Sequence, residues 1–165
     1  MGATLNNRMV FLDNTVLTNF AQVGRPDLIF ALWGDRACTT APVIAEYLAG
    51  VQTSLLPTEA WDVLPVIELP VDEIILPMRL TTKLGAGERS CLAAALHFQG
   101  MFASDDQQAR KIALQSGLTV IGSVGILMRS VQKSLLSKTD AQVLLERMIL
   151  SGYHSPISNL DEILD

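Results

Sequence analysis

A chain of 165 residues in which 49% of the side chains are apolar can bury a sizeable core, which excludes a disordered polypeptide. The net charge of −5 argues against a general nucleic-acid binder with a basic surface, but not against a nuclease whose carboxylates hold cations. Two separated cysteines form no zinc motif, and no apolar run suits a signal peptide or the roughly 20 residues of a membrane span, so we expect one cytoplasmic domain over residues 1–165.

Short apolar runs alternate with helical segments along the chain, without an internal repeat. In chain order we expect a strand over 9–12, helices over 14–21 and 26–33, a strand over 37–40, helices over 42–50 and 58–61, a strand over 63–69, helices over 72–82 and 88–99, a strand over 102–104, a helix over 107–116, a strand over 118–121 and helices over 124–135 and 140–150. This alternation predicts a parallel sheet with helices on both faces. Ligands gather at the carboxyl ends of the strands in such sheets, so acids placed there are informative.

Two acids directly follow predicted strands. Asp13 comes after MVFL and Asp105 after MFAS, which places both at the carboxyl edge of the sheet. Asp106 stands beside Asp105, and neighbouring carboxylates repel each other unless a positive group or water screens them. A helix N-terminus or a divalent metal would supply that positive charge, and capping a helix is as good an explanation for each Asp taken singly.

Two glutamates lie in predominantly apolar helical segments. Glu46 in PVIAEYLAG has little polar surface around it, and a buried carboxylate without a partner is costly. Glu88 opens GERSCLAAALHF, where helical spacing places it on the same face as Cys91 and Leu92. The alternatives are a surface Glu on a short helix for Glu46 and a first-turn acid that stabilises the helix dipole for Glu88.

A cluster of carboxylates without Cys or His ligands suits a hard cation such as Mg²⁺ or Mn²⁺. Such a cation serves phosphoryl chemistry, because it activates a water molecule and stabilises the charge on a phosphodiester under in-line attack.

Four stretches in order carry a resemblance to a known family: VFLDNTVLTNFA, CTTAPVIAEYLAG, LGAGERSCLAAALHFQGMFASDDQQARKIALQSGLTVIGSVGILMRSVQKSLL and SGYHSPIS. They resemble the PIN-domain proteins, in particular the small stand-alone prokaryotic ones related to VapC-type toxins. The resemblance covers nearly the whole chain and is weakest over 55–83. It rests on an ordered series of spaced acids rather than on one specific motif.

The resemblance implies a three-layer α/β/α sandwich with a central parallel sheet, and a Mg²⁺- or Mn²⁺-dependent ribonuclease. It implies the following catalytic and metal-binding acids: Asp13, Glu46, Glu88 and Asp105, with Asp106 as a possible fifth ligand. Many members carry Asp at the position of Glu88, and the longer Glu changes the reach to a metal. Thr15 and Ser104 stand where members often carry a supporting hydroxyl, and Arg110 is placed to pair with Asp105 or Asp106 or to lie solvated on its helix.

The resemblance further implies an RNA substrate cut to 5′-phosphate and 3′-hydroxyl ends, a homodimer and, if the protein is a toxin, a cognate antitoxin that inserts a segment near the acids.

Three other functions are weighed against this one. LDNTV faintly resembles a haloacid-dehalogenase-type phosphatase, but Thr15 stands where the second Asp is required. A response-regulator receiver needs an Asp and a Lys at strand ends that VLPVIELP and TVIGS lack. A catalytically inactive PIN-like binding module stays open, because acids can persist as helix caps.

Overall fold

A computed structural model describes residues 7–53, 56–69 and 84–163 of the chain. Its centre is a five-stranded parallel sheet in the order β3-β2-β1-β4-β5. The strands are β1 (Val10–Leu12), β2 (Ala37–Thr40), β3 (Val66–Ile67), β4 (Met101–Ala103) and β5 (Thr119–Ile121). The central strand β1 is fully buried, as expected where helices cover both faces of a parallel sheet.

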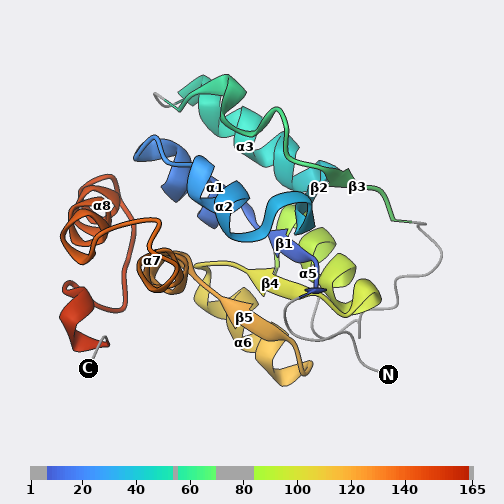
Figure 1. The fold of residues 1–165 in the computed structure, drawn as a ribbon. Helices are drawn as coiled ribbons and strands as arrows, with labels where there is room; N and C mark the ends of the chain where they lie inside the picture. Colours follow the sequence, from blue (N-terminus) through green and yellow to red (C-terminus); the bar gives the residue numbers. More distant parts are fainter. Residues whose placement is uncertain (1–6, 54–55, 70–83, 164–165) are drawn as a thin grey trace.

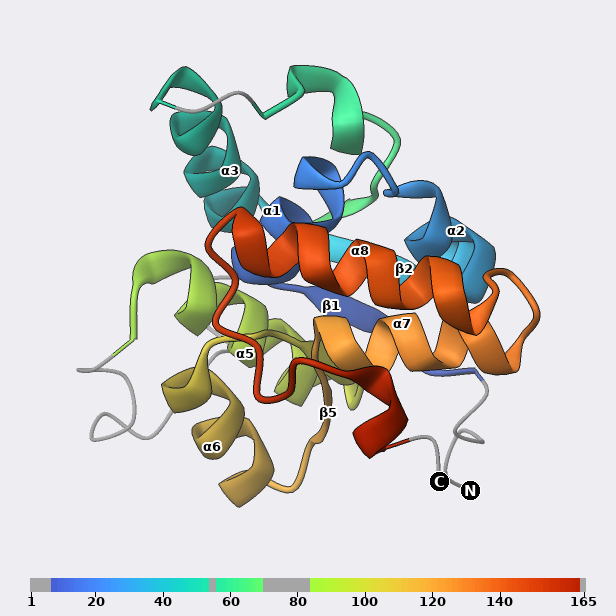
Figure 2. The same ribbon diagram turned by 90° about the vertical axis from the view of Figure 1, so that its left-hand side faces the viewer.

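Helices form a layer on each side of this sheet (Figure 1). The helical elements are α1 (Asn14–Gln22), α2 (Asp27–Trp33), η2 (Gly34–Arg36), α3 (Ala41–Thr53), η3 (Thr58–Trp61), α5 (Ala86–Phe98), α6 (Gln107–Gln115), α7 (Ser123–Gln132), α8 (Lys138–Leu150) and η4 (Leu160–Glu162). One face carries α5 and α6, the other carries α1, α2 and α7, and α8 packs outside on α7 (Figure 2). The expected three-layer α/β/α fold with a parallel sheet is therefore confirmed.

The register across the sheet decides which side chains share a face. Val10 pairs with Ala37 of β2 and Met101 of β4, and the pairing continues residue by residue toward the carboxyl edge. Phe11 of this sheet stacks on Phe98 of α5, with ring centroids 5.8 Å apart. Every second residue along β1, counted from Phe11, therefore faces α5.

Most element boundaries lie within one to three residues of those expected. The strand expected over 63–69 shrinks to β3, an edge strand in which Val66 is 45% exposed. The helix expected over 72–82 lies outside the described residues. The left-handed residue that ends α5 is Gln99, whereas Gly100 is needed because a Cβ there would lie 2.7 Å from the carbonyl oxygen of Met9.

No helix in the described ranges combines the length and apolar character that crossing a membrane requires.

Candidate functional site

Asp13 occupies the carboxyl end of β1 and is 1% exposed. It is the N-cap residue of α1, yet its side chain makes no capping hydrogen bond. Its Oδ2 instead accepts hydrogen bonds from the hydroxyls of Ser104, at 2.8 Å, and Thr15, at 3.2 Å. Its Oδ1 is buried and has no hydrogen-bond partner among the described residues. Helix capping therefore does not explain this carboxylate.

The pKa of Asp13 is raised from 3.8 to about 6. Burial is the main cause and the nearby carboxylate of Glu88 adds to it, while the hydrogen bond from Ser104 acts in the opposite direction. A buried carboxylate with one free oxygen and a second acid nearby is an unfavourable arrangement without a positive charge. A bound cation would relieve it by stabilising the ionised form.

Glu46 and Glu88 meet at the beginning of α5. The Oε1 of Glu46 accepts a hydrogen bond from the Gly87 N–H at 2.8 Å, and the Oε2 of Glu88 accepts one from the Gly85 N–H at 2.6 Å. A Cβ on Gly87 would lie 2.5–2.7 Å from the Glu46 carboxylate, so a larger residue there would force this carboxylate to move. The positive N-terminal end of α5 thus draws two carboxylates to the side of the sheet that Asp13 faces.

Asp105 points elsewhere. Continuing the register of β1 with β4 pairs Asp13 with Ser104, so the next residue, Asp105, turns to the opposite face. Its Oδ2 accepts hydrogen bonds from Asn19 Nδ2 at 2.9 Å and from the Ser123 hydroxyl. Its Oδ1 accepts from the Ser123 N–H at 2.8 Å and the Tyr153 hydroxyl at 3.1 Å. The carboxylate is thus held by donors from α1, α7 and the segment after α8.

Asp106 caps α6, because its Oδ1 accepts a hydrogen bond from the Ala109 N–H at 2.7 Å. Its own N–H donates to the Ser104 hydroxyl at 3.1 Å, the same hydroxyl that donates to Asp13. One hydroxyl group, that of Ser104, therefore connects the backbone of Asp106 to the carboxylate of Asp13.

Thr15 and Ser104 link the ends of β1 and β4. Besides donating to Asp13, the Thr15 hydroxyl accepts a hydrogen bond from the Asp105 N–H at 2.9 Å. Arg110 donates from Nη1 to the carbonyl oxygen of Ser104 at 2.8 Å, and within the described residues it forms no ion pair with Asp105 or Asp106. Both hydroxyls therefore stand where the resemblance implied supporting groups, and Arg110 braces the same strand end.

Sequence reasoning missed three residues that hold Asp105. Asn19 lies one helical turn after Thr15, and Ser123 follows β5 by one intervening glycine, so both positions carried a local signal. Tyr153 carried none, because the path of the segment after α8 depends on tertiary packing. Figure 2 shows this segment running down past α6 and α7. It borders a cavity of about 400 Å³ that Asp105, Arg110 and Tyr153 help to line.

The site residues fit a hard cation in chemistry. Asp13, Glu46 and Glu88 offer only oxygen ligands, and the unpaired buried Oδ1 of Asp13 is the atom that such an ion would satisfy. Within the described ranges, however, no three acidic, His or Cys side chains are already arranged to hold a metal. Forming a site therefore requires side-chain movement, which Glu46 and Glu88 can supply because each accepts one backbone hydrogen bond, from Gly87 of α5 and from its N-cap Gly85, respectively.

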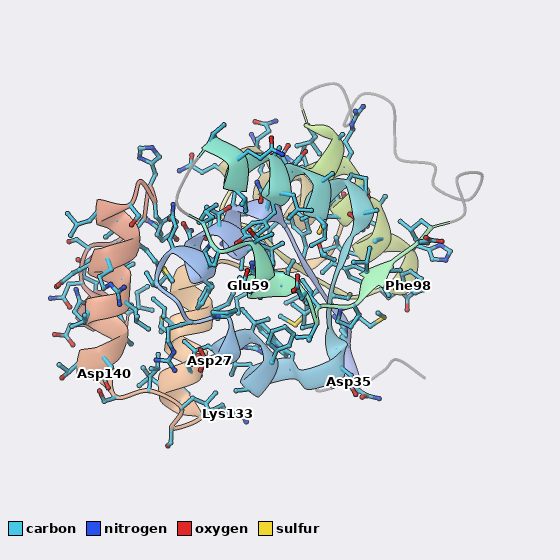
Figure 3. All side chains as sticks on the ribbon, turned by 90° about the horizontal axis from the view of Figure 1, so that it is seen from above. Asp27, Asp35, Glu59, Phe98, Lys133 and Asp140 are labelled. Carbon is cyan, nitrogen blue, oxygen red and sulfur yellow. The ribbon has the colours of Figure 1, made fainter. Side chains whose placement is uncertain are left out.

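Among the described residues, the other acids form no cluster that could hold a metal. Figure 3 shows Asp35, Glu59 and Asp140 well apart from one another, on η2, η3 and α8. All three are exposed.

Comparison with known proteins agrees with the fold. A family model described as a PIN domain matches residues 9–165. Neither the curated proteins nor the solved structures gave a match. PIN domains are generally nucleases that act on RNA or DNA and usually use divalent metals such as Mg²⁺. The family match covers nearly the whole chain, and it agrees with the parallel sheet between two helical layers and with the acids at the carboxyl edge of that sheet. The chain therefore belongs to the PIN-domain family.

Proposed function

We propose that this protein is a Mg²⁺- or Mn²⁺-dependent endoribonuclease. The observation that carries the proposal is the buried carboxylate of Asp13, which leaves Oδ1 unpaired on the side of the sheet where Glu46 and Glu88 converge. A helix cap would not leave that atom free, and a surface acid would not be buried.

The residues at the proposed metal site have different roles. Asp13, Glu46 and Glu88 would hold the cation. Asp106, which is linked to Asp13 through the Ser104 hydroxyl, would be a further ligand. Ser104 and Thr15 fix the orientation of Asp13 through its Oδ2, so that Oδ1 keeps its direction. The cation, when bound, supplies an activated water and stabilises charge on the phosphodiester.

Asp105 has a different part in this proposal. Four hydrogen bonds hold its carboxylate away from Asp13, so we assign it to positioning the end of β4. Direct participation in catalysis, which the resemblance implies, would require it to exchange those donors for the cation.

RNA would approach over the first turn of α5 and the cavity beside α6. Arg89 is exposed directly after Glu88, and Arg110 lines the cavity that Asp105 borders. These cations would contact phosphates, which offsets the acidic net charge of the chain locally.

The test is cleavage of a mixed-sequence single-stranded RNA with Mn²⁺, with Mg²⁺ and with EDTA. Wild type should cut only with metal and leave 5′-phosphate ends, Asp13→Asn should not cut, and Asp35→Asn, an exposed acid on η2, should cut like wild type. Metal-independent cleavage, or equal cleavage by Asp13→Asn, would refute the proposal. Absence of both cleavage and Mn²⁺ binding in wild type would favour the inactive binding module instead.

We also propose a homodimer, as the resemblance implies. Helix α3 is almost entirely apolar but buries only Val43 and Tyr47, and Leu48 is 42% exposed. Its uncovered apolar surface suits a contact with a second copy. Light scattering after size exclusion should give twice the monomer mass of 17.9 kDa for wild type. The measured mass of Leu48→Lys should fall toward that of the monomer.

A toxin role is a narrower proposal, because PIN nucleases often pair with antitoxins. Expression of the nuclease alone should then arrest cell growth. An antitoxin segment that covers Asp13 and Glu46 would inhibit cleavage and so protect the cell.

A further inference from the structure

Thr40 ends β2 and directly precedes α3, a position where a Thr hydroxyl normally caps the helix. This hydroxyl caps nothing. Thr40 is 1% exposed, and its Oγ1 is buried without a hydrogen-bond partner. A buried hydroxyl without a hydrogen-bond partner lowers the stability of the fold, so its presence calls for a ligand that binds there.

The unpaired hydroxyl and the unpaired carboxylate oxygen belong to the ends of two neighbouring strands. Phe11 pairs with Cys38 in the register of β1 with β2. Continuing this register by two residues along each chain places Asp13 opposite Thr40. Residues paired in this way project from the same face of a parallel sheet. The side chains of Asp13 and Thr40 are therefore neighbours on the face that α5 covers.

Two further contacts place this pair against α5. Phe11, in the same row of side chains, stacks on Phe98 of α5. Helix α5 also packs against both β1 and β2, the strands whose ends carry the pair. Cys91 and Glu88 are one turn apart on the same side of that helix.

In the described part of the chain, Asp13 Oδ1 and Thr40 Oγ1 are the two buried side-chain polar atoms that lack a partner. Every other buried polar side chain of this region is satisfied; the adjacent Thr39, for example, donates to the Leu12 carbonyl oxygen at 2.6 Å. That both exceptions fall at neighbouring strand ends points to one shared ligand rather than to two independent defects.

We propose that Thr40 is a further residue of the metal site, whose hydroxyl binds the ion or one of its water molecules beside Asp13. The inference rests on the proposed function and adds a residue from β2 to it. Thr40 is a positioning residue: it holds the ion's coordination sphere and takes no part in proton transfer.

Thr40→Val removes the hydroxyl and keeps the shape of the side chain. If the hydroxyl serves the metal, Mn²⁺ should bind on the order of tenfold more weakly by titration calorimetry, as for other residues that orient a metal site. The metal-free variant should unfold at the same temperature as wild type or higher, because no hydrogen bond of the chain is lost. Thr40→Ser keeps the hydroxyl and should therefore retain the wild-type Mn²⁺ affinity.

Thr39→Val is the matched control. It removes the bond to Leu12, so it should lower the unfolding temperature and leave the Mn²⁺ affinity unchanged. Equal Mn²⁺ affinity of Thr40→Val and wild type would overturn the inference while leaving the proposed function intact. A wild type that binds no Mn²⁺ would overturn the proposed function and this inference with it.

Discussion

Replacing Asp13 by Asn should stabilise the metal-free protein at neutral pH while abolishing its metal binding. The pKa of this carboxyl is raised from 3.8 to about 6, mainly by burial. The ionised form is therefore about 3 kcal/mol less favourable in the folded state than in the unfolded chain. Asn carries no charge and escapes that cost.

The sign of the pH dependence follows from the same pKa. Between about pH 4 and pH 6 the folded state keeps the proton on Asp13 that the unfolded chain has lost, so raising the pH lowers stability. Above the folded pKa of about 6 the loss is complete. The advantage of Asp13→Asn over wild type should accordingly grow by about 2.5 kcal/mol between pH 4 and pH 7, which for a domain of this size corresponds to roughly 5–10 °C in Tm.

The assay is thermal and urea unfolding of both proteins in EDTA across pH 4–8, with Asp35→Asn as an exposed control. A difference between Asp13→Asn and wild type that stays constant with pH would refute the assignment of a raised pKa to this carboxyl. Adding Mn²⁺ at pH 7 should stabilise wild type and the control but not Asp13→Asn, since only a protein that binds the ion in its folded state gains from it.

Three further substitutions separate the roles of the surrounding residues. Gly87→Ala places a Cβ within 2.7 Å of the Glu46 carboxylate, so it should displace Glu46, weaken Mn²⁺ binding in calorimetry and lower Tm; unchanged affinity would contradict that contact. Tyr153→Phe removes one hydrogen bond to Asp105 and should lower the free energy of unfolding by about 1 kcal/mol in urea, without changing Mn²⁺ affinity. Asp106→Asn keeps a good helix cap, so stability should stay within about 0.5 kcal/mol of wild type while Mn²⁺ affinity falls; equal affinity would limit Asp106 to capping.

The sequence was sufficient to predict the strands that end at the site and the helices that follow them. Asp13 could be placed at the edge of the sheet because MVFL is an uninterrupted apolar run and Asp ends it. Glu88 could be placed in the first turn of a helix because glycines precede it.

The division between Asp13 and Asp105 could not be predicted in the same way. It depends on Ser104, rather than Asp105, being in register with Asp13. Register is read from sequence when one face of a strand is polar, but MFA of β4 is buried on both faces and gives no alternation. The same property concealed Thr40, whose lack of a partner appears only in three dimensions.

The hydrogen bond between Glu46 and Gly87 makes the beginning of α5 a competitor for the cation. The N–H of Gly87 and a metal ion would share one carboxylate, so the affinity of the site depends on how firmly the beginning of this helix holds Glu46. Binding should therefore be readable at the backbone, as faster hydrogen exchange at the Gly87 amide when Mn²⁺ takes the carboxylate away. In the metal-free protein the positive end of the helix is the counter-charge of Glu46.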